Sequence, residues 1–231
     1  MTNGLALQPR LRAIADLVPD GARLVDVGTD HGFIPVDLLL SERVSHAIAS
    51  DIGAAPLDHA RRTADQHDVT EGIEFRLCDG LKGISPGEAD CVVIAGMGGD
   101  NIAAILEAAQ WTQEDTLLIL QPMSKAEVLR RWLPVNGYQV IAERLVADKG
   151  VIYPILSVRG GQMEATDESQ YWGGFLLDGD PLLERYLDER ILRLRRAAAG
   201  LEKAKDPAMQ KRRSELCAII SALEHKKGGD R

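Results

Sequence analysis

A short run of β-branched residues stops abruptly at a glycine near the start of the chain. Residues 24–32 read Leu-Val-Asp-Val-Gly-Thr-Asp-His-Gly, and a helical pattern follows at once. Glycines let the backbone approach a ligand, and the first turn of a helix offers it unpaired N–H groups. Asp51 lies nineteen residues after Gly32, at the end of the next apolar run. A carboxylate there can accept hydrogen bonds from both ribose hydroxyls, so the pattern predicts a nucleotide site.

The spacing of this first turn differs from that of a dinucleotide-binding loop. Gly28 and Gly32 enclose Thr29, Asp30 and His31, whereas G-x-G-x-x-G needs a glycine at position 30. A nicotinamide oxidoreductase is therefore the least favoured interpretation. Asp30 is a candidate catalytic residue, because a side chain in place of a glycine hydrogen would point toward the ligand. For His31, proton transfer and a purely structural hydrogen bond both stay open.

A second glycine-rich turn, Ala-Gly-Met-Gly-Gly at residues 95–99, ends a wholly apolar run. In an open α/β sheet, ligands bind beyond the carboxyl ends of the strands, so this turn should lie beside the first. Three glycines leave room for a planar base to approach. Gln121 ends the next apolar run at the same edge, where it can bind a base or cap the following helix. Gly96 and Gln121 therefore join Asp30 as candidate catalytic residues.

Alternating strands and helices are predicted around these turns. Apolar runs predict strands at 23–27, 45–50, 73–77, 91–95, 116–120, 138–145 and 151–158. Helical spacing predicts helices at 8–18, 33–40, 55–66, 101–109 and 125–133. The run 91–95 should be central in a parallel sheet, and Asp148-Lys149-Gly150 predicts a hairpin. Together these elements predict a doubly wound α/β fold with a mostly parallel, seven-stranded sheet.

The pattern changes after Gly160-Gly161. Asp180 followed by Pro181 predicts a helix start. One apolar stripe then runs from 182 to 201, and a second runs from Met209 to 223 after a break at 205–207. Two helices with a short loop predict an antiparallel hairpin. We therefore divide the chain into a nucleotide-binding domain, 1–160, and a linker with a helical hairpin, 161–231.

Charge is distributed unevenly along the chain, whose net charge is −8. Residues 181–231 hold 13 basic and 8 acidic side chains, whereas the other 180 residues hold 14 and 27. A basic tail on an acidic body indicates an anionic partner such as a nucleic acid. The alternative is a hairpin whose cations only keep it solvated.

Composition limits the remaining possibilities. No apolar run approaches the roughly 20 residues that span a bilayer, and the first residues do not resemble a signal peptide. We therefore expect a cytoplasmic protein without a membrane partner, and no oligomeric state is predicted. Cys78, Cys91 and Cys217 lack C-x-x-C spacing, which predicts buried, reduced thiols. The histidines are scattered, so no metal site is expected.

Several segments together resemble the bacterial tRNA (adenine-22, N1)-methyltransferases. The principal ones are Asp-Val-Gly-Thr-Asp-His-Gly at 26–32, Ile-Ala-Ser-Asp at 48–51, Asp-Gly-Leu at 79–81, Ile-Ala-Gly-Met-Gly-Gly at 94–99 and Leu-Gln-Pro-Met at 120–123. The resemblance covers residues 8–160 closely, and the hairpin agrees with that family's C-terminal coiled coil by pattern. It implies a class I (Rossmann-like) methyltransferase fold whose last strand is antiparallel. The implied reaction transfers a methyl group from S-adenosylmethionine to N1 of an adenosine in tRNA.

The resemblance also implies site residues. Asp79 lies where class I methyltransferases place an acidic residue against the adenine amino group. The full set implied to bind the cofactor is Asp26, Gly28, Thr29, His31, Gly32, Asp51, Ile52, Asp79, Gly80, Ala95, Gly96, Met97 and Gly98. Adenine N1 carries a lone pair, so no strong base is required, and Asp30 or the carbonyls at 95–96 could stabilise the cationic product.

Phosphate contacts are expected from the hairpin, because an acidic body repels RNA. The candidate RNA-binding residues are Arg190, Arg193, Arg195, Arg196, Lys203, Lys211, Arg212 and Arg213. Two alternatives stay open at this point. One is a small-molecule methyltransferase with the same cofactor residues, and the other is a non-catalytic adaptor that binds S-adenosylmethionine and a protein partner.

Overall fold

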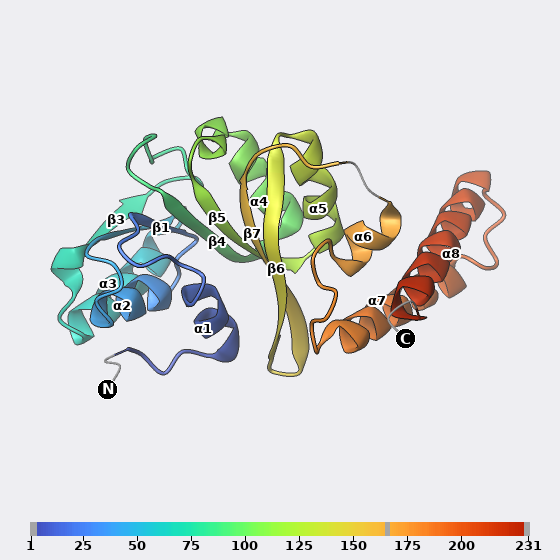
Figure 1. Cartoon of the computed structure of the whole chain (residues 1–231), viewed down its shortest axis with the longest axis horizontal. Helices are drawn as coiled ribbons and strands as arrows, with labels where there is room; N and C mark the ends of the chain where they lie inside the picture. The colour runs from blue at the N-terminus through green and yellow to red at the C-terminus, as the bar shows by residue number, and fades with distance from the viewer. Residues whose placement is uncertain (1–3, 165–166, 229–231) are drawn as a thin grey trace. The chain divides into compact units, whose positions relative to one another are not determined.

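The structure is a computed structural model that describes residues 4–164 and 167–228. The chain divides into two compact units, residues 1–163 and 164–231 (Figure 1). Within the described residues, no helix combines the length and the apolar character needed to cross a membrane.

The first unit contains a seven-stranded sheet in the order β3-β2-β1-β4-β5-β7-β6. The strands are β1 Leu24–Val27, β2 Ala47–Asp51, β3 Ile73–Leu77, β4 Cys91–Gly98, β5 Leu117–Ser124, β6 Tyr138–Asp148 and β7 Val151–Gly160. Strands β1 to β5 pair in parallel, and β7 is antiparallel to both of its neighbours. The predicted sheet is confirmed, with the apolar β4 at its centre.

Helices cover both faces of this sheet (Figure 1). They are α1 Pro9–Ala15, α2 Phe33–Leu40, α3 Ala54–Gln66, α4 Gly99–Glu107 and α5 Ala126–Val135, with short 3-10 turns η1 Thr70–Gly72 and η2 Gln110–Gln113. Alternate strand residues such as Val93 and Ile119 pack with Ile14 of α1 and Leu38 of α2 in one buried cluster. Strands β1 and β4 end at the two predicted turns, and β2 ends at Asp51.

The second unit consists of α6 Glu168–Gly173, α7 Leu183–Gly200 and α8 Pro207–Gly228. Helices α7 and α8 run in opposite directions, as two ion pairs between them show: Arg195 pairs with Glu224 at 2.5 Å, and Asp188 pairs with Lys227 at 2.6 Å. Apolar residues of both helices are buried between them, including Leu187, Leu194, Leu216 and Leu223. The short helix α6 was not predicted, and its N-terminus is capped by Asp167, whose side chain accepts from the N–H groups of Ser169 and Gln170.

Asp180 caps the turn that leads into α7, as predicted: its carboxylate accepts from the N–H of Leu182 at 2.8 Å, and the helix itself begins at Leu183. Two other predictions about the C-terminal region are wrong in detail. Met209 is exposed, so the buried stripe of α8 starts only at Leu216. Cys217 is also exposed, on the solvent side of that helix, whereas Cys91 is buried as predicted.

Candidate active site

The first predicted turn takes a backbone shape that favours glycine. Gly28, Asp30 and Gly32 have φ values of +73°, +46° and +66°, so left-handed backbone recurs at alternate positions. Asp30 therefore adopts a glycine-like conformation at the middle position. The N–H groups of Gly28 and Thr29 donate to the carbonyl oxygen of Ser50 at 2.8 and 3.1 Å, which ties the turn to the end of β2.

A buried carboxylate supports this turn from within the sheet. Asp26 in β1 is only 5% exposed, and one of its oxygens accepts a hydrogen bond from Thr29 Oγ1 at 2.6 Å. Burial raises the pKa of Asp26 to about 6; the hydrogen bond from Thr29 opposes the rise, and the negative charge of Asp51 adds to it. Asp26 therefore acts on the site through Thr29.

A cavity of about 440 Å³ lies where the two predicted turns meet. A Cβ added at Gly28 would lie 2.9 Å from Cε of Met97, so the two turns are adjacent, as predicted. Likewise, a Cβ at Gly80 would lie 3.0 Å from a side-chain carbon of Ile105 in α4. Glycine at both positions keeps the walls of the cavity close together without a clash.

Two carboxylates line this cavity. Asp51 accepts a hydrogen bond from the N–H of Gly53 at 2.7 Å through Oδ1, and its Oδ2 has no hydrogen-bond partner among the described residues. Asp79 forms an ion pair with Lys82 at 2.5 Å. Asp51 thus keeps one oxygen available to a ligand, whereas a ligand that reaches Asp79 also meets Lys82.

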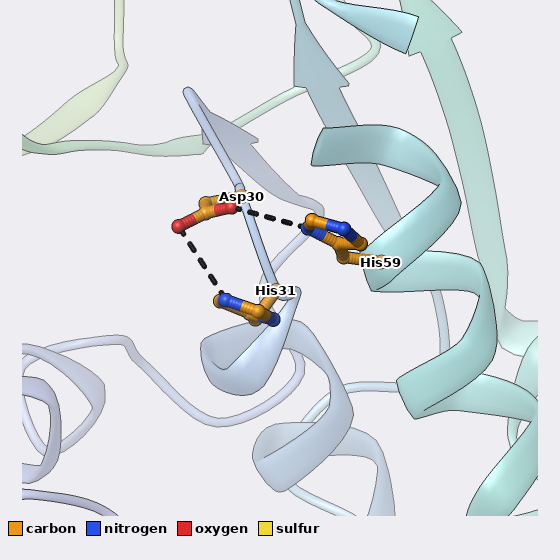
Figure 2. Close-up of side chains that lie close together, drawn as sticks. All are labelled: Asp30, His31 and His59. Atoms are coloured by element: carbon orange, nitrogen blue, oxygen red, sulfur yellow. Dashed lines mark ion pairs between the residues drawn. The ribbon is translucent and has the colours of Figure 1, made fainter. Parts of the chain in front are cut away.

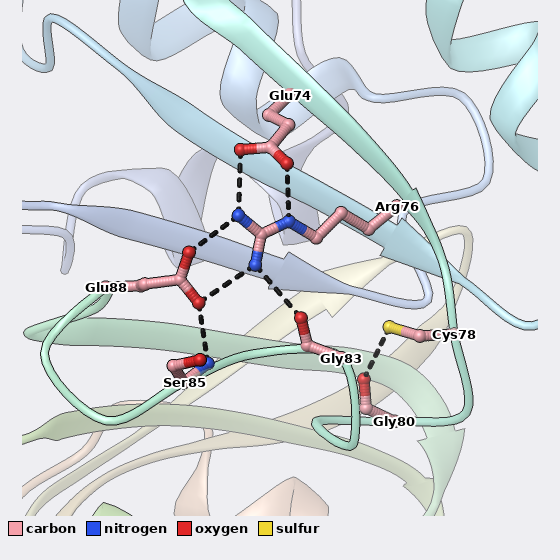
Figure 3. A network of polar contacts seen from close by, with 7 residues as sticks. All are labelled: Glu74, Arg76, Cys78, Gly80, Gly83, Ser85 and Glu88. Atoms are coloured by element: carbon pink, nitrogen blue, oxygen red, sulfur yellow. Dashed lines mark hydrogen bonds and ion pairs between the residues drawn. The ribbon is translucent and has the colours of Figure 1, made fainter.

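An arginine network holds one wall of the cavity (Figure 3). The guanidinium of Arg76, on β3, forms ion pairs with Glu74 and Glu88 at 2.7 Å and donates to the carbonyl oxygen of Gly83 at 2.9 Å. Arg76, followed by the N–H of Ser85, lowers the pKa of Glu88 to about 2. The network therefore fixes the loop after β3, which carries the lining residues 78–82.

Gln121 connects three elements beside the second turn. Its Oε1 accepts hydrogen bonds from Nη1 of Arg10 in α1 at 2.7 Å and from the N–H of Gly96 at 3.2 Å. The guanidinium of Arg10 also lies 5.9 Å from the ring centroid of Tyr153 in β7. Gln121 is fully buried, so in this arrangement it positions the backbone of Gly96.

Asp30 lies between two histidines (Figure 2). Its carboxylate is 3.7 Å from Nε2 of His31 and 3.8 Å from Nδ1 of His59, and the two imidazole rings stack with centroids 5.0 Å apart. Within the part of the chain that the structure describes, these three exposed side chains are the group close enough to share a cation, with ligand atoms within 4.8 Å of one another. His59 belongs to α3, which is why sequence spacing did not reveal the cluster.

The predicted cofactor residues divide into two groups. Gly28, Asp51, Ile52, Asp79, Gly80 and Met97 line the cavity, whereas Asp26, Thr29, His31, Gly32, Ala95, Gly96 and Gly98 lie in the same two turns and their strands without lining it. Sequence reasoning missed Val27, Cys78, Leu81 and Lys82, and a stripe on α4 formed by Asn101, Ala104, Ile105 and Ala108. The spacing of that stripe, three, four and seven residues, is the signal that could have found it.

The basic side chains of the second unit differ in their surroundings. Arg195 pairs with Glu224, Arg212 lies 3.4 Å from Glu215, and Arg190 stacks over the ring of Tyr186. The other five candidates are exposed and have no ion-pair partner among the described residues; they are Arg193, Arg196, Lys203, Lys211 and Arg213.

Comparison with known proteins identifies similar chains. The family profile described as a methyltransferase domain matches residues 7–156. The tRNA (adenine(22)-N(1))-methyltransferase of Bacillus subtilis is 38% identical over 165 residues, which cover 71% of this chain and 69% of that protein.

Solved structures extend the similarity over both units. The crystal structure of the B. subtilis m1A22 tRNA methyltransferase has a TM-score of 0.87 at 29% identity and covers 96% of this chain and 98% of its own. The structure of Streptococcus pneumoniae Sp1610 in complex with S-adenosyl-L-methionine has a TM-score of 0.82 at 31% identity and covers 94% and 97%.

Proposed function

Because this chain belongs to the family of tRNA (adenine(22)-N(1))-methyltransferases, we propose that it methylates N1 of adenosine 22 in tRNA, with S-adenosylmethionine as its cofactor. The observation that carries this proposal is the meeting of two glycine turns over a cavity that contains Asp51. Since the substrate is tRNA, we assign the activity to the cytoplasm.

The residues around the cavity fit this cofactor. The unpartnered oxygen of Asp51 can accept a hydrogen bond from a ribose hydroxyl, and Asp79 can accept one from the adenine amino group. A side chain in place of the hydrogen of Gly28 or Gly80 would collide with the opposite wall, so glycine preserves the width of the cavity. When bound, the cofactor supplies a methyl group on a positively charged sulfur.

The reaction makes a modest demand on the protein. The lone pair of adenine N1 forms a bond to the methyl carbon, the carbon–sulfur bond breaks, and its electrons stay on sulfur. Positive charge thereby moves to the adenine ring, and no proton has to leave first. The protein must align the reacting atoms and exclude water, which is a matter of proximity and orientation. The carboxylate of Asp30 and the carbonyls of Ala95 and Gly96 are the groups that we assign to stabilising the new cation.

RNA binding is assigned to the second unit. An acidic body repels phosphate, whereas Arg193, Arg196, Lys203, Lys211 and Arg213 are exposed cations without ion-pair partners in the described chain. Such side chains can neutralise backbone phosphates without losing an existing contact. We therefore propose that residues 161–231 form the tRNA-contacting domain.

Methylation itself is tested with unmodified tRNA and labelled S-adenosylmethionine, followed by nucleoside mass spectrometry. The expected product is 1-methyladenosine, formed with wild-type tRNA and not with a tRNA that carries guanosine at position 22. A different methylated nucleoside, or methylation of both tRNAs alike, would refute the assignment.

The role of the second unit is tested by charge reversal. Glutamate at positions 193, 196, 211 and 213 should weaken tRNA binding and flatten its dependence on salt, because about one counterion is released for each phosphate contact. Cofactor affinity should stay unchanged. The control reverses Arg195 and Arg212, whose charges already have acidic partners. Unchanged tRNA binding in the variant with all four reversals would show that these cations of the hairpin do not contact tRNA.

A further inference from the structure

A second cavity in the first unit lies beside the first glycine turn and has a volume of about 470 Å³. One side is formed by apolar residues before and within α1, including Leu5, Leu7 and Leu11. His31 and Phe33 form its margin, and they directly continue the turn whose Gly28 lines the cofactor cavity. A ligand in this second cavity would therefore adjoin the reacting centre.

Three aromatic rings are stacked at this margin. The ring of His31 lies between its two neighbours, with centroids 5.0 Å from His59 and 5.2 Å from Phe33, at interplanar angles of 11° and 15°. Phe33 is 38% exposed, and it is the one phenylalanine among the large exposed apolar side chains of the described residues. Exposed, stacked rings at the margin of a cavity form a platform on which an unpaired base can stack.

The wall opposite the apolar residues is polar, and none of its lining residues is acidic; the nearest carboxylate that pairs with it is Asp30, 3.8 Å from Nδ1 of His59. It is formed by one face of α3 with the residue that ends the helix, and its members are His59, Arg62, Thr63, Gln66 and His67. Within the described chain, the side chains of Arg62 and Gln66 have no hydrogen-bond or ion-pair partner. This wall contrasts with residues 1–180, in which acidic side chains outnumber basic ones by 27 to 14.

We propose that this second cavity binds one unpaired nucleotide of the RNA substrate that flanks the methylated adenosine. The base stacks on the open face of Phe33 at one end of this column of rings, and Arg62 contacts the adjoining phosphate. The occupant is a flanking nucleotide because neither Gly96 nor Gln121 lines the cavity. This proposal rests on the tRNA methyltransferase function, since an adenosine that leaves a folded RNA also exposes its neighbours.

The test uses the full chain and compares three substitutions. Phe33→Leu keeps an apolar side chain but removes the ring, Phe33→Trp keeps a ring, and His59→Ala removes the far end of the stack. His46→Ala is the matched control, because His46 is an exposed histidine outside the cavity. We expect Phe33→Leu to raise the KM for tRNA on the order of tenfold, the loss typical of one base–aromatic stack, while Phe33→Trp and the control stay near wild type. His59→Ala should raise the KM by less, because His59 supports the column from the end away from the base.

Two further measurements separate the possible outcomes. The calorimetric Kd for S-adenosylmethionine and the thermal unfolding midpoint should be unchanged in all variants. A tRNA with fluorescent 2-aminopurine beside position 22 should be quenched by the wild type and not by Phe33→Leu. If the wild type methylates tRNA but Phe33→Leu has an unchanged KM and full quenching, the subsite is overturned and the proposed function stands. A changed cofactor Kd also overturns it, and absence of methylation by the wild type overturns both.

Discussion

Replacing Gly96 by alanine tests whether the second turn contacts the target adenine in addition to forming part of the fold. Gly96 has φ of +82°, so a side chain there introduces left-handed strain of about 1–2 kcal/mol. Among the described residues, a Cβ at this position would have no atom within 4 Å beyond its chain neighbours. The new methyl group would therefore meet only what occupies the open space at the end of β4. If the target adenine enters there, its displacement by about 1 Å should lower kcat for tRNA methylation on the order of 100-fold.

The matched control is Gly150→Ala. Gly150 also has φ of +82°, and a Cβ added there would likewise meet no atom of residues 4–164 and 167–228 within 4 Å, but this glycine lies in the turn between β6 and β7. Both variants should lose a similar free energy of unfolding in urea titrations, about 1–2 kcal/mol. Only Gly96→Ala should lose turnover, measured as initial rates with labelled cofactor at saturating tRNA. Equal turnover in the two variants would refute the inference that the base approaches Gly96.

Asp51→Asn should weaken cofactor binding on the order of 10- to 100-fold by calorimetry, because a hydrogen bond to an ionised acceptor is worth about 1.5–3 kcal/mol; Asp58→Asn, an exposed carboxylate of α3, should leave the Kd unchanged. The pKa of Asp26 is raised to about 6 from the usual 3.8, so between these values the folded chain binds more protons than the unfolded chain. The contribution of Asp26 to the free energy of unfolding is therefore greatest below pH 4 and falls by about 3 kcal/mol as the pH rises to about 6. Asp26→Asn should remove this decrease when the free energy of unfolding is measured against pH. Glu143→Gln should lower the free energy of unfolding by about 3–5 kcal/mol, because it removes the charge facing Arg130 in a pair whose side chains are fully buried. An unchanged urea midpoint for Glu143→Gln would contradict that account.

The strands and helices of the first unit were predictable because each follows from a local pattern. Residues 33–40 and 73–77 are predicted to the residue as α2 and β3. The ends of β4 and β5 were not predicted, because residues 96–98 and 121–124 contain little apolar sequence. These segments extend the sheet by pairing with each other in an irregular register, which depends on contacts between distant parts of the chain.

The site was predictable where its chemistry is local in sequence. Asp51 follows a strand at the position expected of a ribose-binding carboxylate, and it lines the cavity between the two glycine turns. His59 carries no local signal, since it is one polar residue on the exposed side of α3. Its stacking with His31 arises only because α3 packs beside α2, and the same holds for Arg10, which reaches Gln121 from 111 residues away.

The partners of Gln121 also restrict its role in the reaction. Both Arg10 and the N–H of Gly96 are donors, so the amide must turn its oxygen toward them, and Oε1 already accepts two hydrogen bonds. Gln121 therefore has no oxygen left for the amino group of an adenine, and its Nε2 already donates one hydrogen bond, to Sδ of Met123 at 3.6 Å. We propose that recognition of the amino group falls instead to the carboxylate of Asp30 and the carbonyls of Ala95 and Gly96. In that arrangement one set of oxygens would both select adenine and stabilise the positive charge of its methylated product.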